Sequence, residues 1–439
     1  MRRRLDGGAQ RAEAPALPAP ERGASLWRNA DFLRLWSAQT ISQFGTQITA
    51  LALPLAAILI LDASATEVAV LTALEWLPWL LISLPAGAFV DRMRRLPVLV
   101  LADVGRGVAL ASVPAAYAFD ALTLWQLYGV GFLVGVLTVF FDVAYQSYLP
   151  SLVERRQLGE GNSKLEVSRS GAGLAGPGLA GVLIELVRAP VAILADAISF
   201  FVSALLLVTI RREERFQKPQ DGTRLRHEIV EGIRYVLGDP VLRPSMAFVA
   251  TSNFFGNVMW TIFLVYAVRR LEWSPGTIGL VLTLGNLGFL AGAVLAPRIG
   301  AKLGVGRTLV GAAMLGGWPL LAVPLAPADH AVPLIVGALV VASFGGVVYN
   351  VVGISLFQAI TPDRLLGRMN ASRRFVVWGV IPLGSLVSGG LAAWIGLRPT
   401  LLVGAVGSAI AFLPLLFSPV WALRDVPEED AAATPAPAA

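Results

Sequence analysis

The sequence predicts an all-α integral membrane protein with twelve transmembrane helices, arranged as two pseudo-symmetric six-helix bundles. Composition is the first observation that predicts this fold class. Of 439 residues, 56% are hydrophobic and only 15% are charged, and the mean hydropathy is +0.68. A soluble domain carries about 25% charged residues. Because a chain this apolar has too little polar surface to cover itself, it needs lipid as its solvent.

The second observation is the length of the apolar stretches. A helix needs roughly 20 apolar residues to cross the hydrocarbon core of a bilayer, and twelve stretches of the sequence meet that length. The predicted spans are Leu35–Leu61, Val70–Val90, Leu96–Phe119, Leu122–Tyr145, Glu166–Leu186, Pro190–Ile210, Ser245–Val268, Thr277–Ala296, Thr308–Leu325, Val332–Phe357, Phe375–Trp394 and Thr400–Trp421.

The third observation is the distribution of basic residues between the two sides of the membrane. If the N-terminus is cytoplasmic, 30 of the 35 Lys and Arg residues fall in cytoplasmic segments and 4 fall on the opposite side. Short loops rich in Lys and Arg stay on the cytoplasmic side, so we expect both termini in the cytoplasm. Topology explains the basic excess, and we expect no nucleic-acid partner.

A charged linker, residues 211–244, divides the chain into halves of nearly equal length. We therefore expect one six-helix bundle over residues 35–210 and a second over residues 245–421. Residues 1–34 and 422–439 are expected to be disordered cytoplasmic tails, and the first lacks the pattern of a signal peptide. A basic hairpin follows the second helix of each half, which is typical of a duplicated unit with its substrate site between the repeats.

Several kinds of chemistry are disfavoured by residue usage. The chain has no cysteine, and its two histidines, His227 and His330, fall in predicted loops. A zinc site or a histidine-based catalytic centre in the membrane is therefore not expected. No Gly-x-x-x-x-Gly-Lys-Ser/Thr motif occurs, so ATP hydrolysis by this chain is not supported. We expect neither a metal nor a cofactor, and no enzyme activity.

The loop after the second predicted helix carries a family signature. The pattern Gly-x-x-x-Asp-Arg-x-Arg-Arg, with Gly87, Asp91, Arg92 and Arg95, resembles the signature loop of the major facilitator superfamily. The resemblance implies a conformational latch between the halves, with the start of helix eleven near Arg373 and Arg374 as its partner. Gly87 is expected to let helices approach closely. The alternative is a basic loop that only sets topology.

Further stretches resemble one branch of that superfamily, the exporters that include enterobactin and macrolide efflux proteins. They are Asn29–Trp36, Ala102–Arg106, Leu149–Val153, Gly161–Ser163, Gly176–Gly181 and Ala195–Phe200. The resemblance implies a monomeric, proton-coupled exporter of a drug- or siderophore-like amphipathic molecule, in the bacterial cytoplasmic membrane. In this branch a polar or acidic residue typically follows the glycine of helix one; here Thr46 follows Gly45. The alternatives are an importer of the same fold and, more remotely, a membrane sensor or enzyme.

The run from Gly171 to Gly181 resembles the Gly-Pro motif of helix five in antiporters. The residues assigned to the motif are Gly173, Gly176, Pro177 and Gly181. Proline has no N–H, so Pro177 releases the carbonyl group of Gly173 and bends the helix. The alternative is close helix packing, which small residues support in any membrane bundle.

Ionisable residues inside the membrane are costly and are candidates for function. Asp103 and Arg106 are three residues apart, so they share a helix face and can form a structural ion pair or act in proton coupling. Glu75 has no basic residue within a helical turn, which makes it a candidate proton carrier. Asp142 and Asp196 are interpreted as hydrogen-bonded residues near helix ends.

Uncharged polar residues recur on otherwise apolar helices, most clearly on helices one and seven, which correspond in the repeat. Because polar side chains avoid lipid, these faces are expected to point inward. They either line a substrate cavity, which we favour, or tie helices together. The candidate cavity residues are Gln39, Ser42, Gln43, Gln47, Asn253, Asn257, Trp260, Asn286, Asn350 and Trp378.

Overall fold

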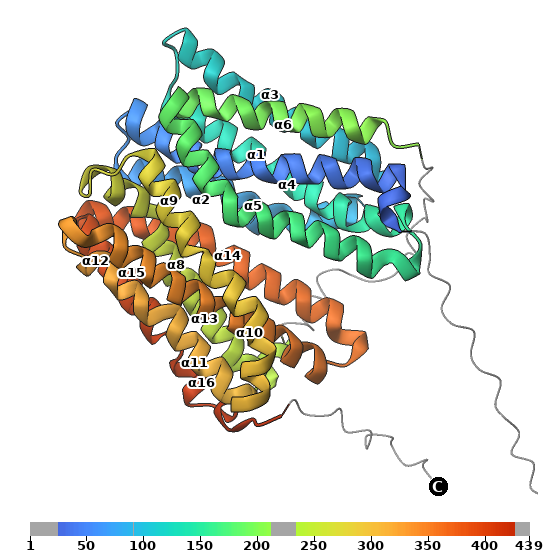
Figure 1. Cartoon of the computed structure of the whole chain (residues 1–439), viewed down its shortest axis with the longest axis vertical. Coiled ribbons are helices and arrows are strands. Elements are labelled where there is room, and N and C mark those ends of the chain that lie inside the picture. Colours follow the sequence, from blue (N-terminus) through green and yellow to red (C-terminus); the bar gives the residue numbers. More distant parts are fainter. Residues whose placement is uncertain (1–24, 91, 212–233, 426–439) are drawn as a thin grey trace, which may run out of the picture.

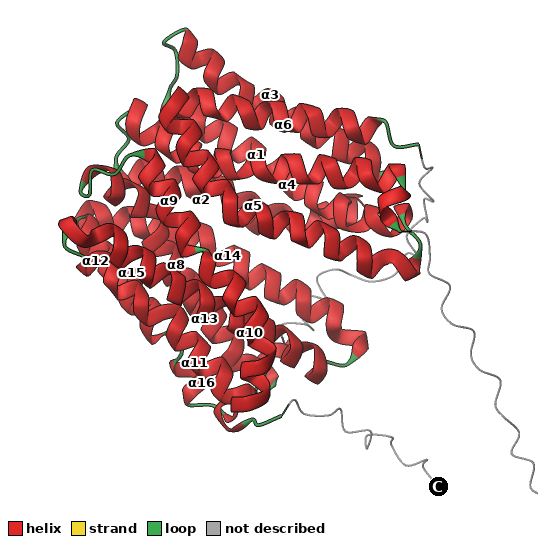
Figure 2. Cartoon of the chain, in the orientation of Figure 1, coloured by secondary structure: helices red, strands yellow, loops and turns green. Residues whose placement is uncertain are grey.

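The computed structural model describes residues 25–90, 92–211 and 234–425 (Figure 1). Within these ranges every regular element is a helix and no strand occurs (Figure 2). Most of both predicted tails, most of the linker and Asp91 of the signature loop lie outside the described residues. The predicted all-α fold is confirmed for the part of the chain that the structure describes.

The helices form two groups that follow each other in the chain. The N-half contains α1 (Ala30–Ile60), α2 (Ala65–Val90), α3 (Arg95–Ala118), α4 (Leu124–Leu152), α5 (Leu158–Val187) and α6 (Ala189–Val208). The C-half contains α8 (Leu242–Arg269), α9 (Pro275–Gly285), α10 (Leu287–Leu303), α11 (Val305–Gly317), α12 (Ala322–Leu325), α13 (Ala331–Ile360), α14 (Asp363–Ile395), α15 (Leu397–Ile410) and α16 (Leu413–Leu416).

Twelve stretches of the described chain are long and apolar enough to cross a membrane, and each overlaps one predicted span. Span eight combines α9 and α10, span nine combines α11 and α12, and span twelve combines α15 and α16. Span eight is interrupted at Asn286, which ends α9 and precedes α10. The sequence analysis predicted a single helix there.

Ordered structure extends into both predicted tails. Helix α1 begins at Ala30, earlier than the predicted Leu35, because the Asn29 side chain accepts hydrogen bonds from the N–H groups of Asp31 and Phe32, both at 3.1 Å. This is a helix N-cap. At the other end of the chain, the carbonyl group of Arg424 accepts a 3.0 Å hydrogen bond from the N–H of Val305 at the start of α11.

The two halves meet at one end of the bundle. We call this the closed end, and the opposite end, where residues 25 and 425 lie, the tail end. At the closed end, one cluster of buried apolar residues contains Leu55 and Ile193 of the N-half together with Val265 and Ile278 of the C-half. At the tail end, each half has its own apolar cluster. Figure 1 shows α5 and α14 diverging from the closed end toward the tail end.

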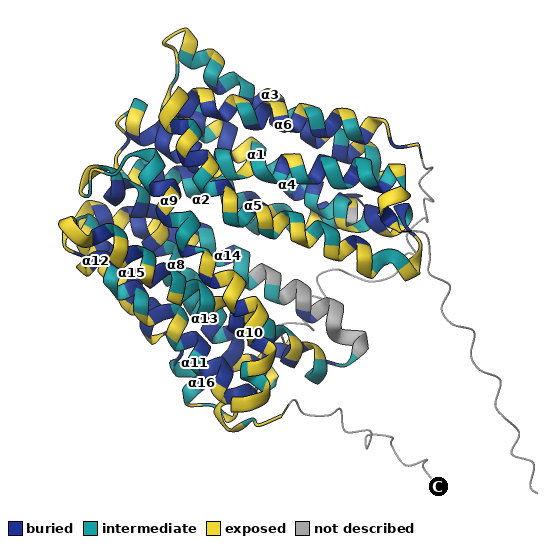
Figure 3. Ribbon diagram, in the orientation of Figure 1, coloured by how far each residue is buried: buried dark blue, intermediate teal, exposed yellow. Residues whose placement is uncertain are grey.

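Burial follows the same division. Buried residues lie on helix faces that point into each half, whereas exposed residues cover the outside (Figure 3). Many of the exposed side chains are large and apolar, such as Leu101, Leu205 and Val294, which are each about two-thirds exposed. An apolar surface of this extent is expected of a protein that faces lipid.

Candidate functional site

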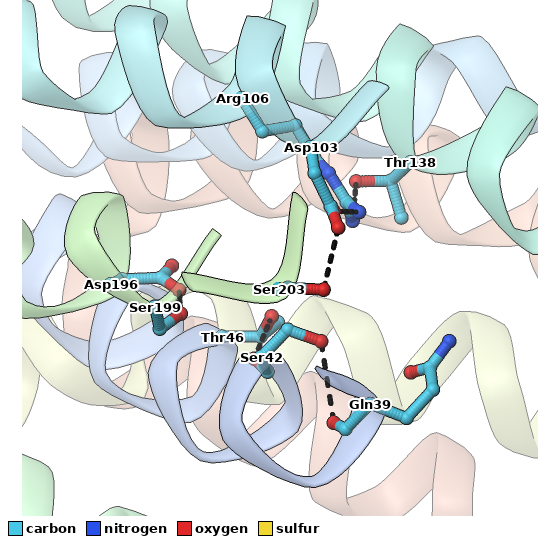
Figure 4. Close-up of polar contacts among 9 residues, drawn as sticks. All are labelled: Gln39, Ser42, Thr46, Asp103, Arg106, Thr138, Asp196, Ser199 and Ser203. Carbon is cyan, nitrogen blue, oxygen red and sulfur yellow. Dashed lines mark hydrogen bonds and ion pairs between the residues drawn. The ribbon is translucent and has the colours of Figure 1, made fainter. Parts of the chain in front are cut away.

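A network of charged and polar side chains lies in the interior of the N-half (Figure 4). Asp103 and Arg106 on α3 form an ion pair, and both side chains are buried. The second carboxylate oxygen of Asp103 accepts a 2.6 Å hydrogen bond from the hydroxyl of Ser203 on α6. Arg106 also donates to the Thr138 hydroxyl on α4, at 3.5 Å. The network therefore ties α3 to both α4 and α6.

Aromatic rings complete the environment of the Arg106 guanidinium group. Its central carbon lies 4.3 Å from the ring centroid of Phe141 on α4 and 4.1 Å from that of Phe200 on α6. A cation held between two ring faces is stabilised by their quadrupoles. Since the same group is ion-paired, its contacts favour the structural interpretation of the Asp103–Arg106 pair. That pair remains only a candidate for proton coupling.

A second buried acid lies beside this network. Asp196 on α6 is 1% exposed and accepts a 3.0 Å hydrogen bond from the hydroxyl of Ser199. A Cβ atom added to Gly45 of α1 would collide with both side chains. The predicted hydrogen bonding of Asp196 is therefore observed, and its side chain is buried among the helices of the N-half. It lies in the interior of the N-half because α1 has a glycine where α6 places its acid.

In the C-half, the predicted polar residues line cavities. Asn253, Asn257, Trp260 and Asn286 line a cavity of about 310 Å³. A neighbouring cavity of about 380 Å³ is lined by Asn253 again and by Asn350, together with Tyr349 and Arg373. Ser252 and Gly316 line both, so the two cavities are neighbours in the space between α8, α11 and α13.

The asparagine amide groups in these cavities are held by backbone carbonyl groups. Asn253 Nδ2 donates to the carbonyl of Val249 at 2.8 Å, and Asn257 Nδ2 donates to the carbonyl of Asn253 at 2.7 Å. Asn286 instead reaches the other half, where its Nδ2 donates to the carbonyl of Gly173 on α5 at 3.0 Å. Helix α8 therefore presents two fixed amide groups on one face.

The N-half has a cavity of about 600 Å³ between α1, α4 and α5. Of the predicted residues, Gln39 and Gln43 line it, together with Asp142, Glu166 and Arg169. Glu166 and Arg169 form an ion pair at 2.9 Å. Ser42 does not line this cavity, and its hydroxyl donates to the Gln39 carbonyl at 3.3 Å. The structure thus separates the two predicted stripes into different cavities.

The Gly-Pro motif of α5 lies where the halves touch. The Gly173 carbonyl, which Pro177 leaves without its usual helical donor, is the group that accepts from Asn286. The Gln47 side chain packs on Gly176, where an added Cβ would lie 2.6 Å from Gln47 Cβ. A Cβ on Gly181 would lie 2.9 Å from the Cα of Gly279. The motif brings α5 into backbone contact with α9.

An aromatic cluster joins α2 to α14. The Trp378 ring centroid is 4.1 Å from that of Trp79 and 5.4 Å from that of Trp76. The sequence analysis placed Trp378 on a cavity face and missed its two partners. Trp76 and Trp79 are three residues apart, so they share a helix face, which was the signal available in the sequence.

Glu75 differs from the other intramembrane acids. Its side chain is partly buried in the N-half, where a Cβ on Gly131 of α4 would lie 3.0 Å from Glu75 Cγ. Among the described residues its carboxyl group has no hydrogen-bond or ion-pair partner. An unpartnered carboxyl group is costly inside a membrane, so Glu75 keeps its place as the candidate proton carrier.

The predicted latch lies at the tail end. Asp91 and the side chain of Arg374 lie outside the described residues, so the latch itself is not described. Arg92 is exposed and Arg95 is partly buried. A Cβ on Gly87 would meet no described atom within 4 Å. The expectation that Gly87 permits a close helix approach stays a prediction, because most side chains at the start of α14 lie outside the described residues.

Polar contacts across the closed end were not predicted from the sequence. Arg269 at the end of α8 donates to the Asp62 carboxylate at 2.7 Å and to the Ala63 carbonyl at 2.9 Å. Glu185 of α5 accepts from the Ser274 hydroxyl at 3.0 Å and from the Gly276 N–H at 2.7 Å. Glu185 therefore caps the N-terminus of α9 from the other half. No short sequence pattern marks these residues as partners.

Comparison with known proteins identifies the fold. Over 89% of this chain and 98% of the other, the structure resembles a bacterial homologue of the iron transporter ferroportin in an inward-facing state, with a TM-score of 0.71 and 16% identity. The same comparison with an outward-facing state with soaked iron gives a TM-score of 0.58 and 17% identity. At these identities the likeness shows the fold alone.

Sequence comparison identifies the family. The multidrug efflux pump Tap of Mycolicibacterium fortuitum is 26% identical over 372 residues, which cover 81% of this chain and 89% of Tap. Residues 23–438 match the transmembrane secretion effector family. The family and these relatives are transporters and not enzymes, as the sequence analysis predicted. The chain is thus a multi-pass membrane transporter and belongs to the transmembrane secretion effector family of the major facilitator superfamily.

Proposed function

We propose that this transporter is a secondary exporter, which moves an amphipathic small molecule by alternating access between its two halves. The observation that carries the proposal is the distribution of contacts and cavities. Described hydrogen bonds between the halves lie from the closed end to the middle of the bundle, at residues such as Arg269, Glu185 and Asn286. The cavities lined by amides and aromatic rings lie inside the halves.

The proposed orientation places the tail end in the cytoplasm. Basic residues concentrate in the loops of that end, which the positive-inside rule assigns to the cytoplasmic side. The conformation is then closed toward the outside and open toward the cytoplasm. The higher TM-score against the inward-facing state than against the outward-facing state supports this assignment.

The efflux direction and the class of cargo rest on the similarity to Tap, whose printed name is multidrug efflux pump. The lining of the larger C-half cavity is consistent with such cargo, since Phe248, Tyr349 and Phe357 offer apolar surface and Asn253 and Asn350 offer hydrogen bonds. Pockets of this kind are typical of drug-sized ligands.

Proton antiport is the proposed source of energy, with Glu75 as the carrier. Its carboxyl group has no polar partner among the described residues, whereas Asp103 is bound by Arg106 and Ser203. A carboxyl group without competing contacts is free to bind and release a proton in each cycle. Glu75→Gln should abolish the dependence of transport on a pH gradient, while Glu67→Gln on the same helix should leave it intact.

Everted membrane vesicles test the whole proposal. A panel of fluorescent amphipathic dyes should include compounds that accumulate in vesicles containing the transporter and that leak out when a protonophore is added. Accumulation without any effect of the protonophore would overturn proton coupling. Dye uptake only by right-side-out vesicles would show an importer, and no movement of any dye in either orientation would overturn the assignment as a drug exporter.

A further inference from the structure

The smaller cavity of the C-half has an unusual polar lining. It lies between α8, α9, α13 and α15, has a volume of about 310 Å³, and is lined only by uncharged residues. Its polar residues include three asparagines, Asn253, Asn257 and Asn286. Asn286 also lines a gap between α5 and α10, so this cavity borders the seam between the two halves.

The hydrogen bonds of the three amide groups fix which of their atoms remain for a ligand. In each case the partner is a backbone carbonyl, which can only accept, so the amide nitrogen must face it. Each residue then keeps a carbonyl oxygen with two lone pairs against a single remaining N–H. Among the described residues no group donates to these three oxygens. The lining is therefore rich in acceptors.

Two serines add to this polar lining. The Ser343 hydroxyl donates to the carbonyl of Gly285 at 2.7 Å, so its oxygen faces the cavity as an acceptor. The Ser408 side chain is 3% exposed, and its hydroxyl has no hydrogen-bond partner in the described structure. A buried hydroxyl without a partner costs free energy unless a ligand or water satisfies it. Ser408 is therefore an unsatisfied polar group in the wall of this cavity.

An aromatic ring completes the cavity wall. Trp260 lies one turn beyond Asn257 on α8 and keeps 36% of its surface exposed. The face of an indole ring attracts cations, and this attraction grows when water is excluded. No basic or acidic side chain lines the cavity. A cationic ligand therefore meets neither repulsion nor an ion pair here.

We propose that this cavity binds the protonated amino group of the transported molecule, with the amide oxygens as hydrogen-bond acceptors and Trp260 as the aromatic wall. An ammonium group has up to three donors and no acceptor, which matches a lining with more acceptors than donors. An anion would face the same oxygens and be disfavoured. This inference rests on the proposed exporter function and names its substrate class, amphipathic amines.

Binding of two matched probes tests the proposal on the whole protein in lipid nanodiscs. The first probe is dansylcadaverine, a fluorescent primary amine, and the second is its N-acetyl derivative, which keeps the fluorophore but has no charge and fewer donors. Because a hydrogen bond to a charged group is worth about 1.5–3 kcal/mol, the amine should bind at least about tenfold more tightly. Equal binding of the two probes would overturn the proposal, without any variant.

Substitutions in the cavity then test whether the preference for the amine probe over the acetylated probe arises there. Asn257→Leu should remove most of the preference for the amine and leave binding of the acetylated probe within about twofold, because one acceptor is lost and little volume changes. Gln126→Leu is the matched control, since the Gln126 amide in the N-half also donates to a backbone carbonyl, that of Ser112 at 3.0 Å, but Gln126 lines neither C-half cavity. A preference that survives Asn257→Leu and Asn253→Leu, or that disappears in Gln126→Leu, would place the amine elsewhere.

The nanodisc binding measurement tests the amine site, whereas the vesicle assay tests the exporter function. The nanodisc measurement needs no gradient and no movement of cargo, so it can succeed even if the vesicle test shows no efflux. In that case the amine site stands and the exporter assignment fails. If vesicles show efflux of dyes but the two probes bind equally, the exporter stands and the amine site fails.

Discussion

Spans one and seven occupy corresponding places in the two halves, and each carries a glycine directly after a phenylalanine. In α1, a Cβ on Gly45 would collide with Asp196 and Ser199 of α6. In α8, a Cβ on Gly256 would meet nothing within 4 Å, because Gly256 lines the smaller C-half cavity. The same position is thus filled by a neighbouring helix in one half and left open in the other.

The polar groups of the two interiors differ in the same way. The N-half uses a buried ion pair with hydroxyl and aromatic partners, centred on Asp103 and Arg106, to lock α3 against α4 and α6. The C-half uses neutral amides tied to backbone carbonyls and leaves space beside them. Under the proposed function, the N-half acts as a scaffold and the C-half binds the cargo.

The largest expected effect is a loss of stability when the ion pair of the N-half is broken. Arg106→Leu leaves Asp103 as a buried charge without its partner, which is expected to cost about 3–5 kcal/mol of unfolding free energy. Denaturant titration in detergent micelles measures the loss. Asn253→Leu, in the interior of the C-half, is the matched control and should cost no more than about 1 kcal/mol.

A double variant separates charge from packing in the same network. Asp103→Leu combined with Arg106→Leu removes both charges, and stability should recover part of what Arg106→Leu alone loses. If Arg106→Leu unfolds at the same denaturant concentration as the wild type, the N-half does not depend on this network and the comparison between the halves fails.

The next largest effect is the difference in stability between alanine substitutions at Gly45 and at Gly256. Gly45→Ala forces Ser199 and Asp196 to move and should destabilise the protein by about 1–3 kcal/mol. Gly256→Ala adds the same methyl group to open space and should leave the unfolding midpoint unchanged. Thermal unfolding of both variants measures the difference. Equal losses in the two variants would show that the C-half interior is as tightly packed as the N-half interior.

Contacts between the halves should be weaker than those inside the N-half, since they must break in each cycle. Gly181→Ala places a Cβ about 2.5 Å from the Pro275 carbonyl oxygen, which disfavours the closed end. We expect a shift of about tenfold toward the conformation that is open at that end, equivalent to about 1.4 kcal/mol.

Distances between spin labels at the tail ends of α5 and α10 measure this shift, and the chain has no cysteine of its own to interfere. The label-to-label distance should shorten in Gly181→Ala. Gly171→Ala is the control on the same helix, because a Cβ there meets nothing within 4 Å. An unchanged distance in Gly181→Ala would contradict the assignment of α5 and α9 as the contact that holds the closed end.

The smallest expected effect concerns the cap that Glu185 provides to α9. Glu185→Gln should change the ratio of the two conformations, measured by the same label distances, by less than about fivefold. The reason is that an exposed charged contact contributes about 1 kcal/mol or less. The effect should fade in high salt because Glu185 is exposed and its charge is screened. Glu272→Gln, an exposed acid at the same end, is the control. A larger effect from Glu272 would argue against a specific cap.

Helix positions were predictable because the apolar runs match the thickness of a bilayer, and this needs no knowledge of neighbours. The role of Pro177 was predictable in part, since a missing N–H frees a carbonyl group wherever the helix lies. The donor to that carbonyl, Asn286, was not predictable, because it comes from the other half. The interior position of Asp196 depends on Gly45 in another helix, and sequence spacing alone does not show such a pairing.

The tryptophan cluster between α2 and α14 has a consequence for observing the cycle. Trp76 and Trp79 belong to one half and Trp378 to the other, and their rings are within stacking distance. Indole rings in contact alter each other's absorption and emission, so a change in the angle between the halves becomes a change in intrinsic fluorescence. A difference spectrum between the wild type and Trp378→Phe therefore isolates an optical signal of the transport cycle, without any added dye.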